Sequence, residues 1–237
     1  PLDELKAYAI RAVWPEHVDA ELLFRNLPYP KQANLVGTYD ATIREVAMTV
    51  RPEHYPAALR WVARSHAQLE TRFDDVIEAV LTGACQHLKD PDVGDAFIEC
   101  ILRLQACHSS ALRKAKVTDK VRKALLEADL ADEYIRWACM ECSEKLPNVP
   151  WYQVCSLWRP EPLFVRAVRL YEAEEDESLK AVLGEFALRI YNFDDASQTE
   201  LLLDLVERDP LFTSQYGWYR TGSVLDSTEA QQHKAEW

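Results

Sequence analysis

The sequence has little glycine, and this scarcity limits the folds open to it. Only 6 of the 237 residues are glycine, while 12 are proline. Tight hairpin turns depend on glycine. β-Branched residues are sparse beside alanine, leucine, glutamate and arginine, which favour helices. No segment alternates apolar and polar residues over the length of a strand. The sequence therefore predicts an all-α protein.

Long apolar runs are also missing. No stretch approaches the roughly 20 apolar residues that a helix needs to cross a bilayer, and no charged segment followed by an apolar one opens the chain. The 6 cysteines fall within helical patterns beside apolar residues, where a free thiol behaves as a small buried hydrophobic group. This usage is typical of a reducing compartment, so we expect a cytoplasmic protein that makes no membrane contact.

Positive charge is scarce as well. Lysine and arginine number 27 against 39 aspartate and glutamate residues, and the formal net charge of -12 repels nucleic acid and anionic membranes. The segment RKAKVTDKVRK at 113–123 is the exception, and it is either a solvated linker or a contact surface. No aromatic residue interleaves it to stack bases, which favours a protein partner. The predicted partner-binding residues are Arg113, Lys114, Lys116, Lys120, Arg122 and Lys123.

Apolar residues recur with the three-and-four spacing of a buried helix face. Short breaks rich in proline, asparagine and aspartate separate these patterns. Counting the segments between the breaks predicts about 11 to 13 helices. The clearest stripes are Ile77, Leu81, Ala84 and Leu88, then Phe97, Ile101 and Leu104, and later Leu179, Leu183, Phe186 and Ile190.

A Pro-Glu-His tripeptide occurs twice, starting at Pro15 and at Pro52, which lie 37 residues apart. Proline fits the first turn of a helix and disfavours helical geometry in the residue before it, so each tripeptide is expected to separate two helices. Pro91 follows 39 residues after Pro52. A period of 37 to 39 residues predicts an irregular HEAT-like α-solenoid of antiparallel helix pairs, as one domain over residues 1–237. Leu22 and Leu59 have the same offset from their prolines and are expected to be buried.

Cofactor and metal motifs are incomplete. GWYRTGS at 217–223 lacks the lysine of a phosphate loop. Cys139 and Cys142 form a single Cys-x-x-Cys pair on an apolar stripe with Ile135 and Leu146, without a second pair. His17 and His54 would lie about one helix spacing, ~10 Å, apart in a solenoid, too far to share an ion. We therefore expect no cofactor and no metal.

An alternative interpretation rests on FDDVIE at 73–78. In an all-α protein this motif resembles the metal site of class I terpene synthases, and the resemblance implies that Asp74, Asp75 and Glu78 hold Mg²⁺ against a diphosphate. The second metal motif of that family is matched in residue types by NFDDASQTE at 192–200, but not in spacing. The competing interpretation places Asp74 and Asp75 at the first turn of a helix, where acids complement the helix dipole.

The segments AVWPEHVDAELLFRNL and PYPKQANLVGTYDATI, with SVLDSTEAQQHKAEW at the end, resemble the helical region that follows the nucleotide-binding core of bacterial NACHT-type signalling NTPases. The resemblance is clearest over residues 5–61 and in the last 15 residues. It implies a helical array that senses a trigger in bacterial immunity while an N-terminal NTPase switches state. The chain begins without methionine and inside a helical pattern. We expect a fragment: a non-catalytic sensor or scaffold module, recognising a protein trigger or other domains of the same chain.

Overall fold

The fold of the described residues is entirely helical. The computed structural model describes residues 2–17, 19–27, 38–69, 74–107, 109–143, 157–158, 163–192, 194–209 and 212. Over these ranges it contains eleven α-helices and two short 3-10 helices, and no strand. The prediction of an all-α protein is confirmed.

The chain divides into two compact units, residues 1–131 and 132–237. The first unit contains seven α-helices and both 3-10 helices: α1 (Leu2–Val13), α2 (Ala20–Asn26), α3 (Thr38–Met48), η1 (Pro52–His54), α4 (Tyr55–Leu69), α5 (Asp74–Ala84), α6 (Pro91–Ala106), η2 (Ala111–Arg113) and α7 (Ala115–Glu127). α8 (Ala131–Ser143) begins at the boundary, and the second unit continues with α10 (Leu163–Ala173), α11 (Glu177–Ile190) and α12 (Ala196–Arg208). The expected single domain over residues 1–237 stays a prediction.

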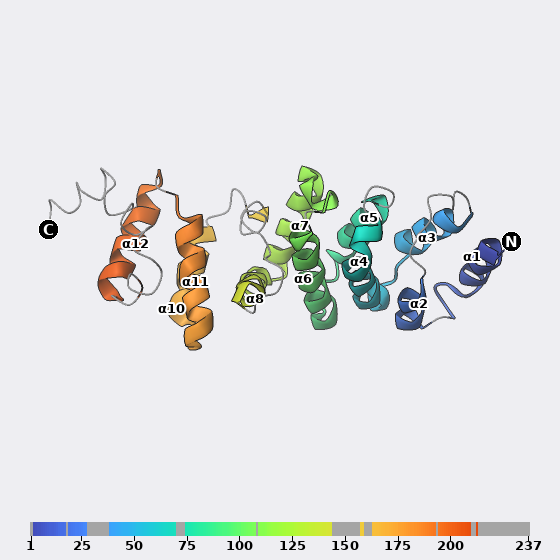
Figure 1. Cartoon of the computed structure of the whole chain (residues 1–237), viewed down its shortest axis with the longest axis horizontal. Helices are drawn as coiled ribbons and strands as arrows, with labels where there is room; N and C mark the ends of the chain where they lie inside the picture. The colour runs from blue at the N-terminus through green and yellow to red at the C-terminus, as the bar shows by residue number, and fades with distance from the viewer. Residues whose placement is uncertain are drawn as a thin grey trace. The chain divides into compact units, whose positions relative to one another are not determined.

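Helices of the first unit contact one another in alternation. α1 packs on α3, α3 on α5 and α5 on α7, while α2 packs on α4 and α4 on α6. Neighbours along the chain, such as α4 and α5, also touch, and Figure 1 shows α4, α5 and α6 side by side. In the second unit α10 packs on α11 and on α12. Each α-helix of the first unit therefore packs on the helix two positions away in the chain, and α5 also packs extensively on its neighbour α4.

Aspartate side chains and prolines begin several of these helices. Asp19 accepts a hydrogen bond from the Leu22 amide at 3.1 Å, and Asp90 accepts one from Asp92 at 3.0 Å just before Pro91. Such caps pair amides that would otherwise lack a partner in the first turn. Pro52 occupies the first turn of η1. The prediction that this proline separates two helices is confirmed.

The predicted stripes on α5 and α6 lie in the core, and the stripe on α11 lies there in part. Ile77, Leu81, Phe97 and Leu104 are each 0% exposed. On α11 the two central residues of the stripe are buried, while both outer residues are half-buried.

The expected burial of Leu22 is wrong. Its relative exposure is 58%, whereas that of Leu59 is 0%. Among the described helices, α4 has α2, α5 and α6 as neighbours, while α2 packs mainly on α4, so α2 buries a narrower face against them. Phe24 occupies that face instead, with its ring 5.5 Å from the Trp61 ring.

Long-range side-chain contacts span nearly the same distance along the chain. In the first unit Arg44 reaches Asp75 over 31 residues, and Arg60 reaches Glu21 over 39. In the second unit Arg166 reaches Asp132 over 34 residues, and Tyr171 reaches Asp209 over 38. These separations match the alternation of helix contacts, because the next helix but one begins a similar distance along the chain.

Candidate functional site

The basic segment begins at Arg113, the last residue of η2, and continues through most of α7. Val117, Val121 and Leu125 are buried at helical spacing and hold α7 against the rest of the unit. Lys116, Lys120 and Lys123 follow one another at intervals of four and three residues, so they share a helix face. All three lysines are exposed. We call these three lysines the α7 basic face.

The structure divides the predicted partner-binding residues into two groups. Three have acidic partners: Lys114 lies 3.2 Å from Glu78, Arg122 lies 2.8 Å from Asp119, and Lys123 lies 3.6 Å from Glu127. The Arg122 side chain is also largely buried. The other three, Arg113, Lys116 and Lys120, are exposed, and no described acidic residue pairs with them. Lys116 and Lys120 are therefore the available charges on the α7 basic face.

The three carboxylates of the acidic motif contact three different partners. Ser110 donates to both oxygens of Asp74 at 2.8 Å, and Arg44 donates to Asp75 at 2.7 Å. Glu78 accepts from Lys114 at 3.2 Å. The acids join α5 to α3 on one side and to the segment before α7 on the other. The structure does not bring them together as a ligand set, and the described residues hold no cluster of three or more histidine, cysteine or acidic side chains suited to a metal.

The histidines of the repeated tripeptide have separate surroundings. His17 is exposed, and His54 packs on Trp14 with ring centroids 5.1 Å apart. The Trp14 indole donates to the Thr49 hydroxyl at 2.9 Å.

The cysteines differ in burial, although the sequence pattern predicts that all of them are buried. Cys100 and Cys139 are buried as expected, but Cys85 is only half-buried and Cys107 is exposed. Cys107 is the C-cap of α6, so it lies past the last buried turn of that helix. The side chain of Cys142, the whole of Leu146 and Cys155, the segment 217–223 and the final 15 residues lie outside the described part of the chain.

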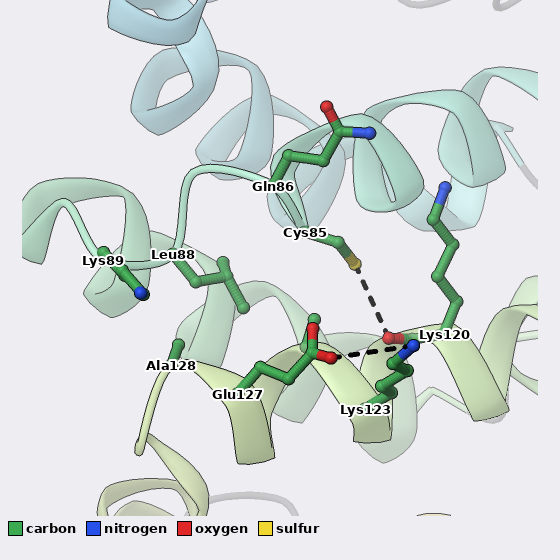
Figure 2. Close-up of a pocket in the computed structure, with 9 residues that line it drawn as sticks. Cys85, Gln86, Leu88, Lys89, Lys120, Lys123, Glu127 and Ala128 are labelled. Atoms are coloured by element: carbon green, nitrogen blue, oxygen red, sulfur yellow. Dashed lines mark hydrogen bonds and ion pairs between the residues drawn. The ribbon is translucent and has the colours of Figure 1, made fainter.

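A pocket of about 580 Å³ lies beside the α7 basic face. Figure 2 shows residues of the turn after α5 on one side of it and residues of α7 on the other. The lining residues are Cys85, Gln86, Leu88, Lys89, Lys120, Lys123, Ala124, Glu127 and Ala128. Sequence reasoning missed the contribution of the turn because it carries no motif. The repeat spacing was a usable signal, since Cys85 lies 35 residues before Lys120.

The Cys85 thiol is held as a neutral group in this pocket. Its Sγ lies 4.0 Å from the Lys120 carbonyl oxygen, to which it donates. Burial raises the pKa of the Cys85 thiol to about 11, and nearby Lys120 lowers it only in part. Burial, with a smaller effect of Cys85, also raises the pKa of the Tyr55 hydroxyl. The pocket therefore presents a protonated thiol at neutral pH rather than a thiolate nucleophile.

Alkylation should reveal the raised pKa of the Cys85 thiol. At pH 8 we expect iodoacetamide to modify Cys85 about two orders of magnitude more slowly than the unperturbed thiol of a short reference peptide, because the thiolate is the reacting form. The Cys85 rate should keep rising with pH up to about 11, whereas an ordinary thiol levels off above about 9. Peptide mapping by mass spectrometry gives both rates, and Cys85→Ser confirms the assignment. Equal rates at pH 8 would contradict the raised pKa.

Comparison with protein-family models, with curated proteins and with solved structures finds no match to this chain. Among the helices that the structure describes, none has the length and apolar content needed to span a membrane.

Proposed function

We propose that the chain is a non-catalytic helical-repeat module that binds an acidic protein surface through the α7 basic face. The observation that carries the proposal is the pair Lys116 and Lys120. Both are exposed on one helix face, and neither has an acidic partner among the described residues, on a chain whose net charge is -12.

The proposed arrangement is an irregular HEAT-like α-solenoid. Its support comes from the first unit, where helices pack in two alternating series, α1, α3, α5, α7 and α2, α4, α6. In a stacked array of helix pairs, each pair contacts only the next, so contacts recur at one sequence distance. The separations of 31 to 39 residues agree with that expectation.

An acidic protein fits the charge pattern better than nucleic acid does. A local basic face steers an acidic partner toward itself while the remaining surface repels it. Proteins that bind single-stranded nucleic acid combine such charges with aromatic stacking platforms. The exposed residues of α7 include no aromatic side chain.

The place of this module in a NACHT-type signalling NTPase belongs to the same proposal. Its support is the resemblance of residues 5–61 to the helical region of that family. On this interpretation the acidic partner is a trigger protein or another domain of the same chain. The complete open reading frame tests it, because a phosphate-loop domain encoded upstream is required.

Charge reversal tests the binding proposal directly. The double variant Lys116→Glu and Lys120→Glu in the full-length protein should lose the partner that the wild-type protein captures from an extract of the source cells and that mass spectrometry identifies. Binding measured with the purified partner should weaken by about ten-fold or more, because two attractive charges become repulsive. Its thermal midpoint should stay within a few degrees, since exposed substitutions usually change stability by about 0.5 kcal/mol or less.

Arg25 and Arg64 provide a control with the same change in charge. Both are exposed, on α2 and α4, and Arg25→Glu with Arg64→Glu alters the net charge by the same amount. That double variant should keep the partner. Equal losses in the two double variants, or retention by both, would show that the α7 basic face is an ordinary solvated surface. A steep fall of affinity with salt, together with nuclease-sensitive capture, would instead indicate nucleic acid.

A further inference from the structure

The pocket beside α7 combines positive charge with an apolar floor. Among the described lining residues, Lys89, Lys120 and Lys123 are basic and Glu127 is the one acid. Leu88 and Ala124 are buried beneath, with exposures of 3% and 6%. A volume of about 580 Å³ lies within the usual range of ligand pockets.

The three lysines do not converge on one point. Figure 2 shows Lys89, from the turn after α5, and Lys120, from α7, at opposite ends of the row of lining residues. A single phosphate or carboxylate contacts one end of this row only. An extended chain with several carboxylates reaches both ends and lays its aliphatic side chains over the floor.

Glu127 neutralises part of the positive charge of the pocket by pairing with Lys123. It lies 3.6 Å from the Lys123 ammonium nitrogen, and both side chains are exposed, 75% for Lys123 and 67% for Glu127. An exposed pair of this kind is weak. An incoming carboxylate therefore competes with Glu127 for Lys123 at little cost.

We infer that this pocket binds an extended acidic peptide segment, with carboxylates at Lys89 and Lys120 and aliphatic side chains over Leu88 and Ala124. The inference rests on the proposed function and deepens it, because it gives the recognised part of the partner a chemical form. It also adds Lys89, which lies outside the basic segment 113–123, to the binding surface.

A synthetic peptide tests the inference. The probe is fluorescein-labelled Glu-Glu-Leu-Glu-Leu-Glu-Glu with blocked ends, titrated with the full chain and followed by fluorescence anisotropy. Its matched control replaces every glutamate by glutamine. Lys89→Glu and Lys120→Glu should each weaken binding of the acidic peptide by about ten-fold, because each reverses a charge that the peptide contacts. Glu127→Gln should strengthen it by about two-fold to three-fold, since it removes the competing carboxylate.

Lys116→Glu separates the pocket from general surface charge. Lys116 is exposed on the same helix, but it does not line the pocket. Its reversal should weaken peptide binding by about three-fold at most, because it adds a repulsive charge one helical turn from Lys120 but removes no direct contact with the peptide. Three results would overturn the inference: equal binding of the glutamine peptide, equal effects of Lys116→Glu and Lys89→Glu, or unchanged affinity in Lys89→Glu. Displacement of the acidic peptide by equimolar pyrophosphate would also overturn it, in favour of a small-anion site.

Partner capture by the variants distinguishes failure of this inference from failure of the proposed function. If Lys116→Glu with Lys120→Glu abolishes partner capture while Lys89→Glu leaves both capture and peptide binding unchanged, the α7 basic face binds the partner without the pocket. If neither set of variants affects capture, the proposed function itself is wrong.

Discussion

Replacing Leu59 with alanine should lower the free energy of unfolding by about 2–5 kcal/mol. Leu59 is 0% exposed on α4, which packs against α2, α5 and α6. Neighbours on several sides cannot all close around the smaller side chain, so part of the lost volume remains as a cavity. Urea denaturation followed by circular dichroism measures the loss.

Leu22→Ala is the matched control, since it makes the same chemical change at the same offset from the preceding Pro-Glu-His. Leu22 is 58% exposed, so its truncation should cost about 0.5 kcal/mol or less. Losses of similar size in the two variants would mean that Leu22 also packs in a core, and that α2 has a second neighbour.

Gly83→Ala should destabilise the chain by about 1–3 kcal/mol, as expected for an overpacked site. The same change inside an ordinary helix gains about 1 kcal/mol. At Gly83 a Cβ atom would lie 2.3 Å from the Tyr55 hydroxyl oxygen and 3.1 Å from its ring carbon Cζ. Tyr55 is 8% exposed and stacks on His87 at 5.3 Å, which opposes a shift of its ring.

The Tyr55→Phe background identifies the cause of this loss. Removing the hydroxyl removes the shortest contact, so Gly83→Ala should cost less there by about 1 kcal/mol or more. Denaturation of the two single variants and the double variant completes the cycle. A neutral or stabilising Gly83→Ala in the wild-type background would show that the Tyr55 ring moves aside freely.

Helical periodicity predicted the core well where a helix has neighbours on several sides. The stripe from Ile77 to Leu88 is buried throughout, because α5 contacts α3, α4, α6 and α7. Periodicity does not tell how many neighbours a helix has. The same rule consequently failed for Leu22 on α2.

The candidate site was predictable in part. The sequence identified the basic segment, and α7 does expose Lys116, Lys120 and Lys123 together. No pattern in the sequence links the acidic motif to the basic segment, yet Glu78 and Lys114 form an ion pair across 36 residues. The pocket was missed because Lys89 reaches it from a turn, and a turn residue acquires its neighbours only through the packing of the helices around it.

The sequence distance of 31 to 39 residues between contacting side chains also bears on how the first unit folds. Closing a loop costs entropy that grows only with the logarithm of its length. Loops of nearly equal length therefore cost nearly the same, and no contact of this kind must wait for a much longer loop to close. On the proposed solenoid arrangement, folding can begin at any helix pair and spread to its neighbours, because stability in such arrays comes from nearest-neighbour contacts. The same arrangement predicts that, during synthesis, each pair can close on the previous one once its own helices have left the ribosome.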